Sequence, residues 1–553
     1  MRRLGWAACA AGTLAMMPAL AQVTAPPFVD SGVQQQRQIE EERRRREREQ
    51  EQRKPTGEPL KREAPSGAAP APSAAESVRF PVRQIRFTES AILAEGELSA
   101  LAQPYLGREL SLADLRGLAE QVNGLYRQRG VVTAQAGIPP QDVSSGVVTI
   151  RLVEGRLGQV LVRGNDTTDA GYVSARVGLK PDDLMDLGRL EDALIRFNRT
   201  NDAQLRAELK PGRRFSTTDV DIAMAEPPRH DLRVTADNLG ADATGRNRLG
   251  LAYSNRSLLG FRDELGLADT RAAGQDSRSA TYAFPVNTWG GRLSLGHYAD
   301  RTAIKNGPLE PLRITGRATA TVLSLRQPTW VDAGAQVDVV AGAKRRKNRN
   351  WIDQVFLSGT DIRDRSLGVE AQLFGATASW FGSFTRSAGH ADTTQRDAFR
   401  IDRGSLRHFR DLGGGFSFRG VLSWQSTRHR NLSSSEQFFI GGEGTVRGYP
   451  VGQFAGDTGQ VLNLELHHPL LAGEGGGWTA TGFLFADGGR VAPFRPPNST
   501  LPAREHLGSV GWGLNLQLGT TAFARLTIGH GQRRLPQMPR SNEVTLQIVA
   551  SVF

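Results

Sequence analysis

The feature that most constrains this chain is an alternation of polarity that runs from residue 229 to the end of its 553 residues. Apolar residues alternate with polar or small ones in short segments, and Gly, Asn, Asp and Pro separate the segments. Residues 510–518 read VGWGLNLQL, and residues 544–552 read VTLQIVASV. A period of two is the pattern of β-strands with one apolar and one polar face.

The alternation fits two folds, a soluble β-sandwich with its apolar faces inside and a membrane β-barrel with its apolar faces outside. Length separates them, because the stretch far exceeds the roughly 100 residues of one sandwich. At roughly 20 residues per strand and connection, the sequence predicts about 16 antiparallel strands, in a range of about 14 to 18. Side chains cannot fill so wide a barrel, so something must line or plug its lumen.

Residues 1–21 predict a secretory signal peptide, with an apolar run that ends at Leu20 and the A-x-A-type cleavage motif Ala19-Leu20-Ala21. A transmembrane anchor is the alternative, but the apolar run is short for one. The only cysteine, Cys9, lies inside this segment. The exported chain would therefore contain no disulfide, no thiol nucleophile and no cysteine metal site.

Residues 33–54 carry an almost wholly charged or amide sequence, QQQRQIEEERRRREREQEQRK from Gln34 onward. Its Glu and Arg residues pair at i,i+3 and i,i+4, which supports a helix, but the helix would have almost no apolar face. Two interpretations stay open, a solvated or disordered segment and a polar plug helix seated in a water-filled lumen. Residues 55–77 are rich in Pro, Ala, Ser and Gly and predict a flexible linker.

Two compact α/β units are predicted at 78–153 and 154–228, each in the order β-α-α-β-β. In the first unit, Ser111 is placed to cap a helix that carries Leu115 and Leu118 on one side. Such units present sheet edges and helix–strand grooves that suit extended chains. The alternative is that they serve as structural spacers.

A formal net charge of +12 raises the question of nucleic-acid binding. Export and the scattering of the arginines argue against it, and arginines that line a polar lumen are the better explanation. We expect no nucleic-acid partner.

The segment Phe439–Pro450, FIGGEGTVRGYP, combines four glycines with a single cation, Arg447. Glycine lets a backbone turn sharply and pack closely where other residues cannot. The pattern therefore predicts a loop around 439–452 that folds inward and delivers one charge to a fixed partner.

Motifs of enzymes are missing from the sequence. It contains no G-x-S-x-G elbow, no H-E-x-x-H and no P-loop. The adjacent histidines His467 and His468 would point to opposite faces of a strand. We expect no enzymatic activity, no cofactor and no metal site.

Taken in order, the segments resemble a two-partner secretion transporter of the TpsB kind, similar to the filamentous-haemagglutinin and haemolysin exporters. These proteins belong to the superfamily that includes the BamA assembly proteins. In this resemblance the α/β units are POTRA domains. The runs Leu125–Thr133 and Gly146–Gly155 are very like the first POTRA of the family, although Val131 stands where an aromatic residue is expected.

Two further motifs carry the resemblance. The run Val446-Arg447-Gly448-Tyr449 matches the signature of the family's sixth extracellular loop, which folds back into the barrel. Phe485, Asp487 and Gly489 match the F-x-D-x-G strand segment that faces this loop. The resemblance implies a salt bridge between Arg447 and Asp487. A carboxylate in phase with Phe483 and Phe485 would also be costly unless a cation paired with it.

The resemblance implies a barrel in the Gram-negative outer membrane, with the POTRA domains in the periplasm. The transporter would secrete a dedicated TpsA-like exoprotein, such as an adhesin, a cytolysin or a contact-dependent toxin, in extended form. Outer-membrane lipid and the barrel-assembly machinery would be its other partners. The alternative is a general barrel-assembly factor of the BamA kind, which usually carries more POTRA repeats and lacks the polar helix.

Overall fold

The computed structural model describes residues 33, 59–61, 78–129, 131, 134–214, 217–393, 396–473, 477–495, 499–535 and 542–553. The predicted signal peptide lies outside these residues. So does the predicted plug helix at 33–54, apart from Val33, which is helical and buried.

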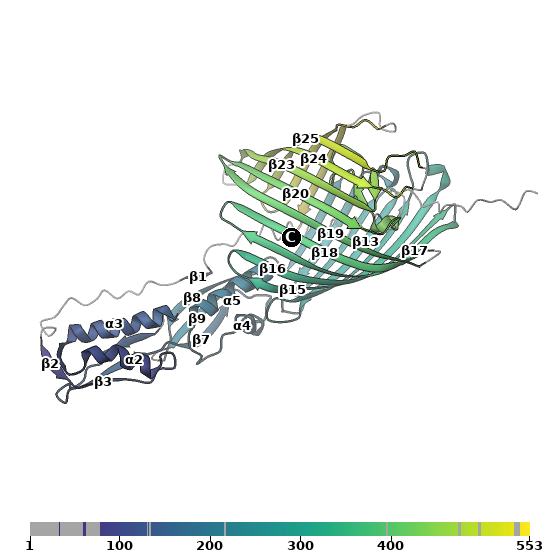
Figure 1. Cartoon of the computed structure of the whole chain (residues 1–553). Helices are drawn as coiled ribbons and strands as arrows, with labels where there is room; N and C mark the ends of the chain where they lie inside the picture. Colours follow the sequence, from purple (N-terminus) through teal and green to yellow (C-terminus); the bar gives the residue numbers. More distant parts are fainter. Residues whose placement is uncertain are drawn as a thin grey trace, which may run out of the picture.

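Sixteen strands of the described part of the chain form one closed barrel (Figure 1). Each strand pairs with the next in the barrel, and the last, β27, closes antiparallel onto the first, β10. This confirms the predicted membrane-barrel fold. The strands are β10 (His230–Asp237), β11 (Arg248–Arg256), β12 (Glu264–Ala272), β13 (Gln275–Pro285), β14 (Arg292–Ala303), β15 (Ile314–Val331), β16 (Ala335–Ile352), β17 (Val355–Phe374), β18 (Ala378–Asp392), β19 (Arg396–Gly413), β20 (Phe416–Thr427), β23 (Thr458–Ala472), β24 (Trp478–Ala492), β25 (Glu505–Leu518), β26 (Ala522–Gly531) and β27 (Asn542–Ser551).

The apolar faces of the strands point outward. On β24, Leu484 is 62% exposed whereas its neighbour Phe485 is 5% exposed. Large apolar side chains remain exposed around the whole wall, among them Leu251, Leu267, Leu295, Leu323, Leu367, Phe384, Leu406, Leu462, Trp512 and Leu546. A soluble sandwich would bury this face, so the observed alternation is that of a barrel in lipid.

The barrel wall is not equally tall all round. Strands β15, β16, β17 and β19 have 18 to 20 residues, whereas β10, β11 and β12 have eight or nine. At roughly 3.3 Å per residue, the long strands extend well beyond a hydrocarbon layer. One side of the barrel therefore offers a large surface above the apolar band.

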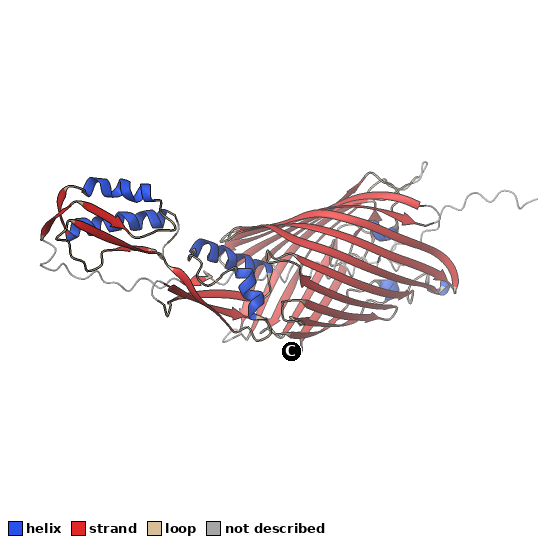
Figure 2. Cartoon of the chain, turned by 90° about the horizontal axis from the view of Figure 1, so that it is seen from below, coloured by secondary structure: helices blue, strands red, loops and turns tan. Residues whose placement is uncertain are grey.

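Two α/β repeats project from one end of the barrel, with their helices on one face of each sheet (Figure 2). The first repeat pairs β3 with β6 and β6 with β5 around a core that includes Leu118, Val122 and Tyr126. Ser111 caps α3 as predicted, because its hydroxyl accepts from the Asp114 backbone N–H. Its elements are β2 (Arg79–Val82), β3 (Gln84–Phe87), α2 (Glu95–Ala102), η2 (Gln103–Tyr105), β4 (Arg108–Ser111), α3 (Leu112–Gln128), β5 (Gln135–Gly137) and β6 (Val147–Val153).

The second repeat has a four-stranded sheet in the order β1-β8-β9-β7. Its helices bury Val173, Leu190, Leu194 and Phe197 against that sheet. Each of these apolar side chains contributes roughly 1.5–3 kcal/mol when it leaves water. Its elements are β1 (Leu60–Lys61), β7 (Arg156–Arg163), α4 (Ala170–Val177), α5 (Leu187–Thr200), β8 (Gln204–Pro211) and β9 (Thr217–Ala225).

Strand β1 is a departure from the flexible linker expected over 55–77. Leu60 and Lys61 pair in parallel with Ala207 and Glu208 of β8. Leu60 is 3% exposed and belongs to the core of the second repeat, so burial holds this part of the segment in place. Pro59 is described as well, and its carbonyl accepts from the Ala207 N–H at 2.8 Å; the rest of that range lies outside the described residues.

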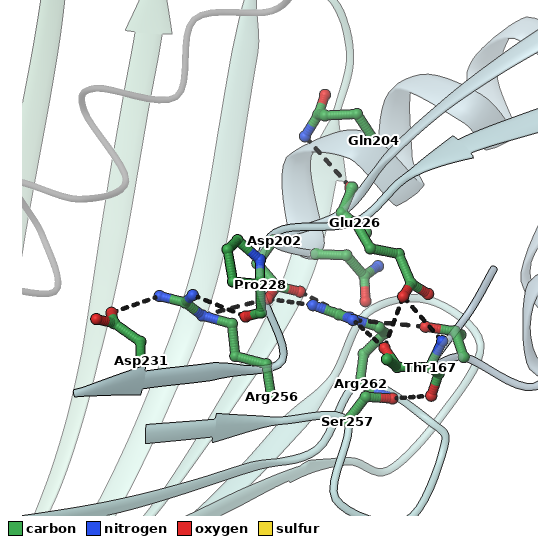
Figure 3. A network of polar contacts seen from close by, with 12 residues as sticks. Thr167, Asp202, Gln204, Glu226, Pro228, Asp231, Arg256, Ser257 and Arg262 are labelled. Carbon is green, nitrogen blue, oxygen red and sulfur yellow. Dashed lines mark hydrogen bonds and ion pairs between the residues drawn. The ribbon is translucent and has the colours of Figure 1, made fainter. Parts of the chain in front are cut away.

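Hydrogen bonds and ion pairs join the second repeat to the barrel turns that lie next to it (Figure 3). Arg262, in the β11–β12 turn, is 2% exposed and forms a bidentate ion pair with Asp202 of the repeat. In the same turn, Ser257 donates to the Thr167 carbonyl at 2.8 Å, and the Gly260 carbonyl accepts from the Asp169 N–H at 2.7 Å.

Arginines of α4 and α5 extend this junction to neighbouring turns. Arg176 donates to the Asn287 carbonyl at 2.9 Å, and the Arg199 guanidinium lies 3.6 Å from the centre of the Phe374 ring. Burial lowers the pKa of Arg176, which keeps its charge at any physiological pH. The orientation of the repeat is thus set by several turns together. No helix of the described residues combines the length and apolar character needed to cross a membrane.

Candidate functional site

A long connection between β20 and β23, residues 428–457, turns back into the barrel, and we call it the lumen loop. It contains the turn η5 (Ser434–Glu436) and a small hairpin of β21 (Phe438–Ile440) with β22 (Phe454–Gly456). Ile440 and Val446 are fully buried and pack with apolar wall residues. The inward loop predicted around 439–452 is therefore present in the structure.

Arg447 and Asp487 lie in contact at the tip of the lumen loop. The guanidinium donates from Nε to Asp487 Oδ2 and from Nη2 to Oδ1, both at 2.7 Å. The Arg447 backbone N–H donates to the same carboxylate at 3.1 Å. The two side chains are 4% and 0% exposed. This is the planar, two-point geometry that arginine gives and lysine does not.

Three wall residues complete the surroundings of Arg447. Its Nη1 donates to Glu465, and its guanidinium lies 3.7 Å from the centre of the Phe485 ring. Asn463 donates to Asp487 at 2.8 Å. Strand register brings these residues together, because Asn463 lies opposite Asp487 and Glu465 lies opposite Phe485. Phe485 of the predicted wall motif thus faces the cation directly.

The polar network continues along the wall. Arg525 of β26 donates to Glu465 at 2.9 Å and lies 3.3 Å from Glu443 of the loop. Glu443 in turn accepts from the hydroxyls of Thr527 and Thr545, at 3.1 and 3.0 Å. The tip of the loop is therefore joined to β23, β24, β26 and β27.

Glycines allow the close approach of loop and wall. Gly448 has φ of +81°, and a Cβ there would lie 2.9 Å from the Gly531 nitrogen and 3.0 Å from the Gly529 carbonyl carbon. On the wall, a Cβ at Gly489 would meet Val446 at 2.7 Å. Both predicted glycines thus sit where a side chain would collide with the opposing segment.

Tyr449 follows Gly448 and is 2% exposed. Its hydroxyl donates to the Gly508 carbonyl at 3.1 Å and accepts from the Arg533 N–H at 2.8 Å. All four residues of the predicted loop signature, Val446, Arg447, Gly448 and Tyr449, are therefore packed against the wall.

A second anchor holds the entering arm of the lumen loop. Glu436 is 1% exposed and lies 2.9 Å from Lys344, 3.3 Å from Arg346 and 2.9 Å from Arg403. These cations belong to β16 and β19, on a part of the wall away from β23 and β24. The sequence interpretation missed Glu436, Glu465, Asn463 and Arg525, because only the strand register and the loop's path reveal their partners.

The ion pairs and hydrogen bonds of this network have a structural role. Its carboxylates are occupied by arginines, lysine and hydroxyls, so they hold the loop in the lumen. Among the described residues, no group of three or more His, Cys, Asp or Glu side chains is arranged to hold a metal ion.

Comparison with known proteins decides the family. A family model described as haemolysin secretion/activation protein ShlB/FhaC/HecB matches residues 216–517, more than half of the chain. The chain belongs to this family. A second model, the ShlB-type POTRA domain, matches residues 80–155, which are those of the first repeat.

Curated relatives agree with this assignment. The outer membrane transporter CdiB of Dickeya dadantii is 27% identical over 415 residues, which cover 70% of this chain and 72% of the relative. The heme/hemopexin transporter protein HuxB of Haemophilus influenzae strain 86-028NP is 25% identical over 447 residues, which cover 75% and 77%.

Solved structures share the fold. CdiB from Escherichia coli has a TM-score of 0.68 at 21% identity and covers 95% of this chain and 99% of its own. CdiB from Acinetobacter baumannii has a TM-score of 0.64 at 16% identity, with coverages of 94% and 98%. BamA from Haemophilus ducreyi, lacking POTRA domains 1–3, reaches 0.50 at 14% identity. BamA is thus a distant structural neighbour.

As a member of the ShlB/FhaC/HecB family, the chain is a TpsB-type outer-membrane transporter of two-partner secretion. Its barrel lies in the outer membrane and its POTRA domains lie in the periplasm. The predicted family, fold and location are confirmed. The barrel turns that contact the second POTRA domain are consequently periplasmic, and the opposite rim is extracellular.

Proposed function

We propose that this transporter exports one dedicated TpsA-like exoprotein in extended form, and that the anchored lumen loop is needed for export. The observation that carries the proposal is the buried Arg447 guanidinium, which Asp487 and Glu465 hold against the lumen wall. A loop fixed in this way sets the width and lining of the lumen. Loss of Arg447 or of Asp487 would leave the other side chain buried with its charge uncompensated.

The partner belongs to the class of large secreted proteins, whether adhesin, cytolysin or contact-dependent toxin. Names of the relatives support a transport role: CdiB is an outer membrane transporter and HuxB a heme/hemopexin transporter protein. We propose that POTRA domains 78–153 and 154–228 bind the unfolded partner along a sheet edge. The polar segment 33–54 would act as a plug that leaves the lumen during export.

The remaining partners follow from the same role. The barrel contacts outer-membrane lipid and depends on the barrel-assembly machinery for insertion. The sequence carries no nucleotide-binding motif, so folding of the exported protein outside the cell would supply the driving force. The chain would have no enzymatic activity of its own.

Gene deletion with complementation tests the proposal. Deletion should abolish secretion of one large exoprotein and leave other outer-membrane barrels at normal levels; a general loss of barrels would instead support an assembly factor. Complementation by Arg447→Ala or Asp487→Ala should restore the inserted barrel without secretion. Breaking a desolvated ion pair by removing one partner costs roughly 3–5 kcal/mol of stability, and the cost is smaller in a water-filled lumen.

Arg490→Ala is the matched control for this experiment. Arg490 lies on the same strand as Asp487 but is exposed, and its guanidinium donates to Gln460 of the neighbouring strand at 3.2 Å. Its replacement should leave secretion unchanged. Wild-type secretion by both Arg447→Ala and Asp487→Ala would remove the salt bridge from the mechanism.

A further inference from the structure

The tall side of the barrel carries arginines on its outer surface. Lys344, Arg346 and Arg403 reach Glu436 inside the lumen, so the residues that alternate with them face outward. On β16, β17 and β19 these outward residues include Arg345, Arg363, Arg365 and Arg400, and all four are exposed. We call these four residues the outer arginine surface.

Strand register stacks these residues in rows across the wall. Arg345 lies directly opposite Arg363, and Arg363 lies opposite His390. One row nearer the periplasm, Ala388 lies between Arg365 and Arg400. The first row therefore places two arginines side by side on adjacent strands, and the second row holds two more that are separated by one strand.

Apolar rows begin just below the arginines. Arg386 and Asp402 form an intermediate row, and the next row consists of the exposed side chains Val339, Val369 and Phe384. The outer arginine surface therefore starts where the apolar band ends, on the extracellular side of the barrel. In a membrane this is the depth of the outer-leaflet headgroups.

The nearest carboxylates toward the extracellular rim form the next row, where Asp361 lies opposite Asp392 and pairs with Arg349 at 2.6 Å. Arg386 pairs with Asp402 at 2.7 Å, but no ion pair within the described residues involves Arg345, Arg363 or Arg365. Like charges directly opposite each other on neighbouring strands destabilise a sheet. The short side of the barrel differs, because there Asp269 pairs with both Arg271 and Arg278, at 2.9 and 3.1 Å. Arg345 and Arg363 therefore repel each other across adjacent strands, and this repulsion favours the binding of an external anion.

The surface is also concave. A pocket of about 1410 Å³ lies against it, and its outward-facing lining includes Thr321, Arg345, Arg363, Arg365, His390 and Arg400. Arginine binds phosphate through two parallel N–H donors, which gives both strength and orientation. The pocket is large enough for a headgroup, and the apolar row beneath it would meet the acyl chains.

We propose that the outer arginine surface binds the phosphate-bearing headgroup of an outer-leaflet lipid. The bound phosphates would cancel the repulsion between Arg345 and Arg363 and would fix the tall wall relative to the membrane. This site is separate from the lumen loop, so it does not depend on the proposed export mechanism.

Direct binding tests the proposal with the full-length transporter in neutral detergent. The probe is purified bisphosphorylated lipid A, and lipid retained by the protein is counted by native mass spectrometry. The triple variant Arg345→Gln, Arg363→Gln, Arg365→Gln should bind roughly 100-fold more weakly, since each surface cation contributes about 1 kcal/mol. The double variant Arg271→Gln, Arg278→Gln, on the charge-balanced side, should bind like the wild type.

Thermal unfolding gives a second readout, in which Arg363→Gln should have opposite effects on stability without and with lipid A. In neutral detergent, Arg363→Gln should unfold at the same temperature as the wild type or higher, because it removes repulsion. With lipid A present, the wild type should gain more stability than the variant. The heat-dependent shift of the folded barrel in gel electrophoresis verifies that every variant is folded.

Four results would overturn the proposal. These are equal lipid A binding by the triple variant, equal binding of dephosphorylated lipid A, full displacement by inorganic phosphate at the same concentration, and displacement of lipid by the secreted partner. The third result would assign the site to free phosphate, and the fourth would assign it to the exported protein.

Discussion

At the scale of single residues, the lumen site depends on desolvation. Arg447 is buried, so its N–H donors need acceptors from the protein. The carboxylates of Asp487 and Glu465 accept hydrogen bonds from it, and the Phe485 ring lies against its guanidinium. Lysine could not reproduce the two parallel bonds to Asp487 and the contact with the ring at once. The residue type at position 447 is therefore set by geometry as well as by charge.

Gly448→Ala should disturb the loop tip. A Cβ would lie 2.9 Å from backbone of β26, and the φ of +81° is itself unfavourable for alanine. Backbone strain of this kind costs on the order of 1–3 kcal/mol. We expect reduced secretion and faster protease cleavage of the loop in the inserted barrel.

Gly452→Ala provides the matched control. Gly452 also has a positive φ, +68°, but its nearest neighbour to a Cβ is a Phe439 side-chain atom at 3.8 Å. Both variants share the strain of a positive φ, and only Gly448→Ala adds the collision. Equal effects of the two substitutions would show that close packing against β26 is not the cause.

At the scale of elements, the lumen loop is anchored twice with opposite polarity. Its tip carries a cation to carboxylates on β23 and β24, and its entering arm carries Glu436 to cations on β16 and β19. Because the two anchors bind different parts of the wall, the loop crosses the lumen as a strut.

Glu436→Gln should loosen the entering arm and leave the tip in place. Arg346 and Arg403 would then lose the Glu436 carboxylate and Lys344 would keep Asp364 at 3.6 Å, at a cost of roughly 3–5 kcal/mol for a fully desolvated cluster. A spin label at Ser433→Cys reports the motion, in a background where Cys9, the only native cysteine, is replaced by Ser. We expect a more mobile label than in the control Glu310→Gln, which changes an exposed turn; unchanged mobility would contradict the second anchor.

At the scale of the whole molecule, the second POTRA domain and the barrel are joined by several turns. The buried Arg262–Asp202 pair lies at the centre of this junction, and Arg176 and Arg199 reach separate turns. The direction in which the POTRA domains extend is therefore fixed by the barrel end. A partner bound to them would be presented to the lumen at a set angle.

Arg262→Ala should widen the range of orientations of the second POTRA domain. The change removes the bidentate pair with Asp202, whose contact with Arg256 is longer, at 3.7 Å. Spin labels at Arg213→Cys and Thr520→Cys, both exposed positions, measure the distance between domain and barrel. We expect a broader distance distribution than in the control Arg271→Ala. A distribution as narrow as that of the wild type would show that the other turns suffice.

The sequence alone determined the strands, the α/β repeats and the loop signature. The side-chain period of a strand is fixed by its backbone, so alternation at 510–518 or 544–552 already defines which residues share a face. The glycines around Arg447 likewise indicate a sharply turning, closely packed backbone at that position. Both inferences need only residues that are neighbours in the chain.

Only the tertiary structure decided which residues meet. Glu465 reaches Arg447, Glu436 reaches Arg403, and Arg345 faces Arg363, because barrel closure and strand register bring together positions that are distant in sequence. Leu60 joins a core more than a hundred residues away for the same reason. A shift of one residue in register would turn each of these side chains to the other face of the wall. That register is a property of the closed barrel, and no local pattern specifies it.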